Sequence, residues 1–248
     1  MLMTVIGRDP SASTYGELAG IRVLITGFSP ACGVDVARAF ADHRGRLVLH
    51  TAISSPECDV LASMLAQTAS EIKVFTGACS SNDDAIRFAQ TAAQAFGGLD
   101  AVINLIPVTA TDLKGLESES DIEDLVADKL NLPLLVTRIA ANRMRLTLTE
   151  GLVLNVMTMP APETDAEAAI AGVARTALAA ITRGEAAKWG QHSIRINAIG
   201  PRAMAGEAGA CLASEPDIAA LALYLASKRG RSLSGHIFEA AGIAARRC

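Results

Sequence analysis

The most constraining feature of the sequence is a long alanine-rich segment between two short apolar runs. Residues 151–157 and 194–199 form the apolar runs, and residues 165–189 form the alanine-rich segment. Short apolar runs are typical of strands buried on both faces, and strand, helix and strand in succession make the crossover unit of a parallel sheet. The segment therefore predicts an α/β fold built on a parallel sheet.

The same alternation occupies most of the chain. Further strands are predicted at 21–26, 46–51, 72–75, 101–105 and 233–238, and further helices at 34–43, 57–69, 82–96, 122–144 and from Pro216 onward. This order predicts a Rossmann-type doubly wound parallel sheet of about seven strands with helices on both faces. We expect residues 20–248 to form this single domain and residues 1–19 to form an N-terminal arm.

Composition excludes several classes of function. A net charge of −4 gives no reason to expect nucleic-acid or anionic-membrane binding, and no apolar run has the length of a membrane span. The start of the chain lacks the charged-then-apolar order of a signal peptide. Five scattered cysteines indicate reduced thiols and a cytoplasmic protein, and the four histidines do not cluster, so no metal site is expected.

Two stretches carry a family resemblance. Residues 194–199 followed by Pro201 resemble the "IRVNAIxPG" segment of short-chain dehydrogenases/reductases, and the turn from Gly27 to Gly33 resembles their glycine-rich cofactor motif. The run around Asn104 resembles their "LVNNAG" strand. The resemblance covers residues 20 to 242 and implies an NAD(P)-binding fold, with Gly27, Gly33 and Asn104 as candidate cofactor-binding residues.

The catalytic positions of the family are altered. Members carry Tyr-x-x-x-Lys on the second long helix, where the lysine lowers the pKa of the phenol that transfers the proton. Counted back from Asn197, these positions fall on Ala171 and Arg175, and the family's catalytic serine position falls on Thr158. Asn131 occupies the position of the family's helix asparagine. The resemblance thus implies that these four family positions are degenerate and that the chain has no catalytic residue.

Other positions of the family's cofactor site have changed as well. Ala31 replaces the middle glycine, Cys79 stands at the adenine-side aspartate, residues 105–107 replace the small-residue floor, and Arg202 stands beside the nicotinamide position. We expect this chain to bind no cofactor, and NAD(P) only if the cleft is still functional.

The resemblance also implies an assembly. Family members form tetramers through their two long helices, here 122–144 and 165–189, and some pair an intact subunit with a degenerate one, including enzymes of hydroxyacyl-CoA substrates. We expect a catalytically silent subunit that supports an intact NAD(P)-dependent partner. Two alternatives stay open: an active oxidoreductase with atypical catalytic residues, and a stand-alone ligand-binding or regulatory protein.

Overall fold

Seven parallel strands form one sheet through the whole molecule. The computed structural model describes residues 15–79, 81–116, 118–202 and 212–240, so most of the expected N-terminal arm lies outside the described residues. The strand order is β3-β2-β1-β4-β5-β6-β7, and every neighbouring pair is parallel. The strands are β1 (Arg22–Thr26), β2 (Arg46–Thr51), β3 (Glu71–Thr76), β4 (Ala101–Pro107), β5 (Leu152–Thr158), β6 (Arg195–Pro201) and β7 (Ile237–Ala240). The predicted fold class is confirmed.

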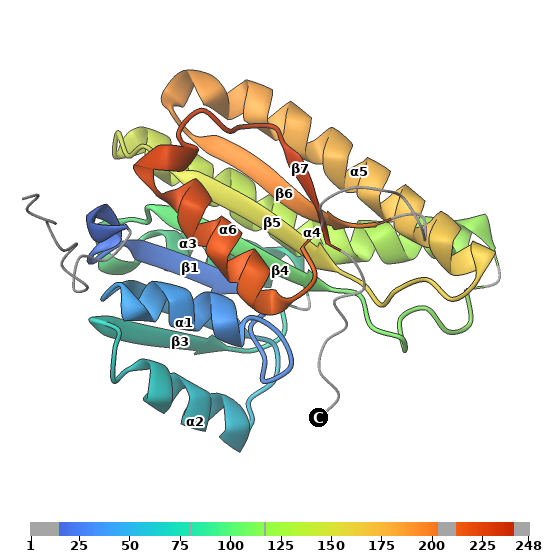
Figure 1. Cartoon of the computed structure of the whole chain (residues 1–248), viewed down its shortest axis with the longest axis horizontal. Helices are drawn as coiled ribbons and strands as arrows, with labels where there is room; N and C mark the ends of the chain where they lie inside the picture. The colour runs from blue at the N-terminus through green and yellow to red at the C-terminus, as the bar shows by residue number, and fades with distance from the viewer. Residues whose placement is uncertain (1–14, 80, 117, 203–211, 241–248) are drawn as a thin grey trace, which may run out of the picture.

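Helices cover both faces of the sheet (Figure 1). The helices are α1 (Val34–Asp42), α2 (Pro56–Leu65), α3 (Asn82–Ala93), α4 (Glu119–Leu146), α5 (Asp165–Trp189) and α6 (Glu215–Ala226). Buried side chains of α1, α2 and α6 share one apolar cluster, and those of α3, α4 and α5 lie in the two clusters of the opposite face. The bounds predicted for the alanine-rich helix are those of α5.

The last strand differs from its prediction. It begins at Ile237 rather than at Leu233, because the chain first turns back toward β6. Gly235 has φ +80 and donates its amide to the carbonyl of Ile196, and the Ser234 hydroxyl accepts from the Ile196 amide. A left-handed turn is not compatible with a strand, so pairing with β6 starts only after it.

The starts of the helices follow a common rule with one exception. Ser or Thr side chains cap α2, α3, α4, α5 and α6 by accepting a backbone amide of the first turn (Ser55, Ser81, Ser118, Thr164 and Ser214). Such caps satisfy amides that have no partner within the helix. Helix α1 is preceded by Gly33, which has no side chain that could cap it. Its first amides therefore need a partner from elsewhere.

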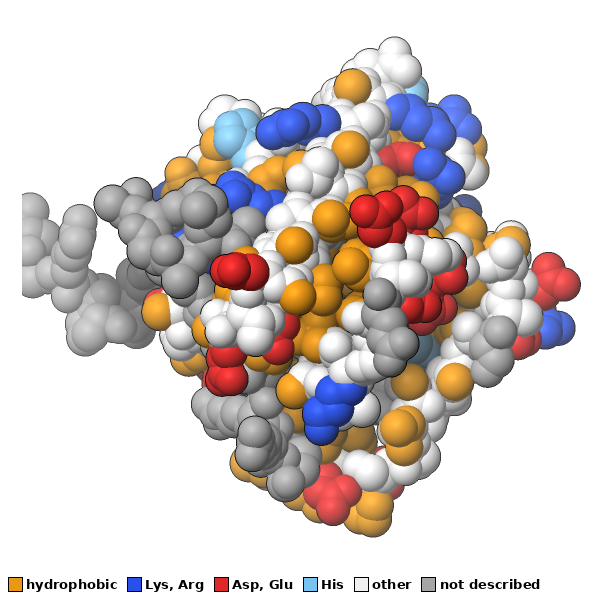
Figure 2. Space-filling model, turned by 90° about the vertical axis from the view of Figure 1, so that its right-hand side faces the viewer, with side chains coloured by type: hydrophobic (Ala, Val, Ile, Leu, Met, Phe, Trp, Pro, Cys, Tyr) orange, Lys and Arg blue, Asp and Glu red, His pale blue; other side chains and the backbone are white. Residues whose placement is uncertain are grey.

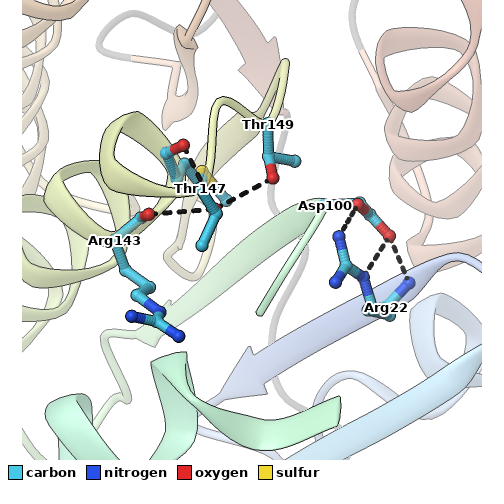
Figure 3. Close-up of polar contacts among 6 residues, drawn as sticks. Arg22, Asp100, Arg143, Thr147 and Thr149 are labelled. Atoms are coloured by element: carbon cyan, nitrogen blue, oxygen red, sulfur yellow. Dashed lines mark hydrogen bonds and ion pairs between the residues drawn. The ribbon is translucent and has the colours of Figure 1, made fainter. Parts of the chain in front are cut away.

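A group of polar contacts lies at the amino-terminal ends of the strands (Figure 3). Asp100, just before β4, accepts from the Arg22 backbone amide and Nε at 2.9 Å and pairs with Arg22 Nη2 at 2.5 Å. Beside it, Thr147 donates to the carbonyl of Arg143 and contacts Thr149. The Arg22–Asp100 pair holds the starts of β1 and β4 together, and the Thr147 bonds close the end of α4. The carboxyl ends of the strands lie at the opposite side of the sheet, where ligand sites of such folds are built.

Among the helices of the described residues, none is both long and apolar enough to cross a lipid bilayer.

Candidate functional site

Asn104 is buried in the centre of the sheet. Its side chain is fully inaccessible and accepts from the Thr26 hydroxyl at 2.9 Å. It donates to Asn155 Oδ1 at 2.7 Å and to Thr137 Oγ1 at 3.2 Å. The side chain thereby ties β1, β4, β5 and α4 together. Both polar atoms of this side chain form hydrogen bonds within the core. This candidate cofactor-binding residue therefore has a structural role.

The two remaining glycines of the cofactor motif pack against Leu105. Gly27 has φ +71 and Gly33 has φ +92, a region that favours glycine. A Cβ on Gly27 would overlap the Leu105 carbonyl, and a Cβ on Gly33 would overlap the Leu105 side chain. Leu105 is itself buried, at 5 % exposure. In this chain both glycines are therefore required by contact with β4.

Replacing Gly33 by alanine is expected to destabilise the fold by about 1–3 kcal/mol, through the positive φ and the overlap with Leu105. In a Leu105→Ala background the cost of Gly33→Ala is expected to be smaller, because the overlapping methyl is gone. Urea denaturation of the four variants of this cycle measures the difference. Gly77→Ala is the control for backbone strain alone, since Gly77 has φ +144 and nothing within 4 Å of a Cβ. Equal costs in both backgrounds would contradict the packing role.

Thr158, at the serine position, lies beside the glycine-rich loop. It ends β5, is 6 % exposed, and its side chain is near enough to the Cys32 thiol to act to lower the pKa of that thiol. Burial, with a smaller contribution from the nearby Glu215 carboxylate, raises the pKa of Cys32 to about 12. The thiol is therefore neutral and unreactive at physiological pH. The residue at the family's serine position thus lies next to a neutral thiol of the glycine-rich turn.

Ala171, at the tyrosine position, lies in an apolar cluster between α4, α5 and the strand ends. Its side chain is fully buried. The cluster contains Ile106, Val108, Val126, Leu130, Met157, Met159, Ile170, Ala174, Leu178 and Ala198. Ile106 comes from the segment that replaces the family's small residues. Larger apolar side chains thus fill the space beside Ala171.

Arg175, at the lysine position, forms an ion pair with Glu239 on β7. Arg202 Nε lies 3.6 Å from the other carboxylate oxygen of Glu239. All three side chains are largely buried, between 17 % and 32 % exposed. A guanidinium remains protonated at any physiological pH, so Arg175 cannot exchange a proton with a substrate. The arrangement fixes α5 to the end of β7.

Asn131 is exposed, and its side chain bonds to α3. Its Nδ2 donates to Asn82 Oδ1 at 3.0 Å, which joins α4 to the first residue of α3 in an exposed position. It also lines a groove of about 660 Å³ between α4 and α5. Cys79 lies 3.8 Å from His50 Nε2 in a separate pocket of about 300 Å³ at the end of β3. Among the described residues, Asn131 and Cys79 therefore lie in two different pockets.

The sequence did not identify Glu239 or Glu215 as residues of the site. Glu239 stands at the end of β7, and Arg175 is a signal that a carboxylate partner is needed there. Glu215 is the first residue of α6, and its carboxylate accepts the Asp35 amide at 2.8 Å. Burial is the main reason that the pKa of Glu215 is raised. Nothing local in the sequence indicates that Glu215 contacts α1.

The described residues contain no group of three or more His, Cys, Asp or Glu side chains that could hold a metal ion.

Comparison with known proteins agrees with this architecture. A momilactone A synthase of Oryza sativa subsp. japonica is 26 % identical over 245 residues, with 88 % of each chain covered. A short-chain dehydrogenase/reductase from Serratia marcescens superposes with a TM-score of 0.70 at 17 % identity, covering 92 % of this chain and 99 % of that one. A short-chain type dehydrogenase/reductase from Mycobacterium marinum gives a TM-score of 0.72 at 17 % identity, covering 91 % and 95 %.

The family model described as short chain dehydrogenase matches residues 22–217, which is most of the chain. The match spans both the glycine-rich turn and the two long helices. The chain therefore belongs to the short-chain dehydrogenase family.

Proposed function

We propose that this chain is a catalytically silent member of the family that supports an intact NAD(P)-dependent subunit. The observation that carries the proposal is that both positions of the proton-transfer pair are built into the fold. Ala171 is fully buried among apolar side chains, and Arg175 is paired with Glu239. Loss of a general acid–base group typically reduces a rate by about 10²–10⁴. The reaction of the partner is hydride exchange between NAD(P) and an alcohol or ketone, with hydroxyacyl-CoA compounds as one substrate class.

No other phenol replaces the missing one. The chain has two tyrosines, Tyr15 and Tyr224. The Tyr15 ring lies under Arg229 and near His43, and Tyr224 is in the last turn of α6, where its carbonyl accepts from Ser227. Helices α1 and α6 run antiparallel to the strands, so they end near the amino-terminal ends of the strands. Tyr15, beside the end of α1, and Tyr224, in the last turn of α6, therefore lie on the side of the sheet opposite Thr158. This placement argues against an active enzyme that uses a relocated acid.

The side chains around the glycine-rich turn do not fit a dinucleotide. Leu105 rests on Gly33, where such cofactors need close backbone approach, and Thr158 lies beside Cys32 in the same region. We therefore derive no chemical step through a nicotinamide in this chain. The proposal includes a cytoplasmic location, supported by the free thiols of Cys32, Cys58 and Cys79.

The groove between α4 and α5 is the surface that fits a partner of the same family. It is lined mainly by apolar side chains, among them Val126, Leu130, Leu134, Val173, Ala177 and Ile181. Val173 is 44 % exposed. In the space-filling view onto the end of the molecule where α4 and α5 begin, hydrophobic side chains form a band bordered by acidic ones (Figure 2). An apolar groove with a polar border is the usual composition of a subunit contact.

The test uses the purified full-length chain, alone and co-expressed with an intact Tyr-x-x-x-Lys paralogue. Alone, it is expected to show no saturable NADH or NADPH binding by calorimetry and no carbonyl reduction. Together, the two chains are expected to co-purify, and Val173→Glu is expected to abolish the association by placing a charge in an apolar contact. Val60→Glu is the matched control, because Val60 is an equally simple exposed valine, on α2.

Three results would contradict the proposal. Turnover by the chain alone would favour an active oxidoreductase with atypical residues. A homo-oligomer that ignores the paralogue would favour a stand-alone ligand-binding or regulatory protein. Association that survives Val173→Glu would exclude the α4–α5 groove as the contact.

A further inference from the structure

We propose that the Glu215 carboxylate is an internal substitute for the cofactor phosphate, seated on the amides of α1 that a dinucleotide would use. This inference deepens the proposed loss of cofactor binding by naming the group that occupies the anion site. It concerns the contact between α6 and α1 and does not depend on which partner the chain has.

The first step is the missing cap of α1. The first amides of any helix lack partners within the helix, and they carry partial positive charge. The five other α-helices satisfy this need with a Ser or Thr just before their first residue, whereas α1 has Gly33 at that position and no side-chain cap. In a dinucleotide fold the helix after the first strand leaves these amides open for the pyrophosphate.

The second step is that a carboxylate meets these amides. Glu215 Oε1 accepts the Asp35 amide at 2.8 Å, and the nearby amides of Gly33 and Val36 also act to lower the pKa of this carboxylate. An oxygen-bearing anion that faces the amides at the start of a helix is the arrangement that binds phosphate. Here the anion comes from residue 215 of the same chain, 180 residues away from Asp35.

The third step is that the contact is built into the packing. Glu215 opens α6, whose buried residues Ile218, Ala219 and Ala222 share the apolar cluster of α1 residues Val36 and Phe40. Glu215 is half-buried, and its position is fixed because α6 is capped separately by Ser214. Because Glu215 belongs to a helix that already packs on α1, no loop has to be ordered to bring its carboxylate to the amides. A free phosphate compound has to displace it.

Burial of this carboxylate, more than the neighbouring Asp35 charge, raises the pKa of Glu215 despite the three amides. A raised folded-state pKa means that this group stabilises the fold most below its ordinary value of 4.5, and that the contribution is lost as pH rises through the folded-state pKa. An ionised Glu215 carboxylate therefore lowers the stability of the fold at neutral pH. Other groups near it are Asp35 and the neutral Cys32 thiol.

The experiment is calorimetric titration of the full chain with inorganic pyrophosphate and with ADP. Wild type is expected to show no saturable binding, and Glu215→Ala is expected to bind with an affinity at least about tenfold above the wild-type limit, because the α1 amides become available. Asp217→Ala is the matched control. It removes the same charge from the same first turn, but Asp217 accepts from Ala213 and Ser214 instead.

A second variant keeps the test decisive where Leu105 restricts the space. Glu215→Ala combined with Leu105→Ala opens the cover over Gly33, and its folding is checked by circular dichroism and thermal unfolding. If neither Glu215 variant gains binding over wild type and Asp217→Ala, the substitution of phosphate by Glu215 is wrong. Pyrophosphate binding by wild type as tight as by Glu215→Ala also overturns it.

The two proposals fail separately. No Glu215 variant is expected to reduce carbonyl compounds, because Ala171 and Arg175 remain. A gain of anion binding without turnover supports both proposals. Absence of that gain with a silent wild type removes only the role of Glu215, and turnover by wild type removes the silent-subunit proposal.

Discussion

Replacing Ala171 by tyrosine is expected to lower the stability of the chain by more than about 3 kcal/mol, without creating activity. Ala171 is fully inaccessible and packs among Ile106, Met157 and Ile170. A phenol ring there must displace well-packed neighbours, and its hydroxyl must be buried without an assigned partner. For a chain of this size, such a loss corresponds to a fall in melting temperature of about 6–12 °C. Differential scanning calorimetry measures it.

Ala169→Tyr is the matched control for this prediction. It makes the same change on the same helix at an exposed position, and a loss within about 0.5 kcal/mol is expected. The combination Ala171→Tyr with Arg175→Lys restores both family residues, and NADH oxidation with a panel of ketones is expected to remain at background. Unchanged stability of Ala171→Tyr would show that a cavity for the phenol persists. Turnover by the double variant would show that only the two side chains had been lost.

Replacing Asn104 by alanine is expected to destabilise the fold by about 3–5 kcal/mol. The substitution removes the hydrogen bonds to Thr26, Thr137 and Asn155 and leaves their polar atoms buried. A buried group that loses its partner retains the full desolvation penalty, which is larger than the net value of the bond. Urea denaturation with a two-state fit gives the change in the free energy of unfolding.

Asn131→Ala is the control, because Asn131 also occupies an asparagine position of the family but makes one exposed hydrogen bond, to Asn82. We expect a change within about 0.5 kcal/mol. A cost for Asn131→Ala equal to that of Asn104→Ala would contradict the assignment of Asn104 as the core bridge. If Asn104→Ala left stability unchanged, water in the core would have to satisfy the polar atoms that Asn104 contacts.

The elements of the fold were predictable because their signals are local. The bounds of α5 followed from the Pro/Glu/Asp segment before it, the alanine-rich run and the glycine after Trp189, and the structure adds a cap by Thr164. The apolar runs of β4, β5 and β6 are buried on both faces, which makes them continuous rather than alternating. The start of β7 was wrong because a turn at Gly235, held by hydrogen bonds to β6, delays the strand.

The candidate site was predictable only as a set of losses. Counting from Asn197 placed the missing phenol at Ala171 and the missing ammonium at Arg175, and both positions now have a described environment. What replaced them was not readable. The decisive contacts join residues far apart in the chain: Leu105 packs on Gly33, Thr158 lies beside Cys32, and Glu215 accepts an amide of α1.

The amino-acid sequence by itself determined the parallel α/β architecture and the absence of the tyrosine and lysine, because periodicity, caps and residue identity are properties of short segments. Only the tertiary structure decided where polar side chains point: Asn104 into the core, Arg175 toward Glu239, and Glu215 onto the amides of α1. The physical reason is that such partners meet through the packing of helices and strands, which brings together groups as far apart as residues 35 and 215.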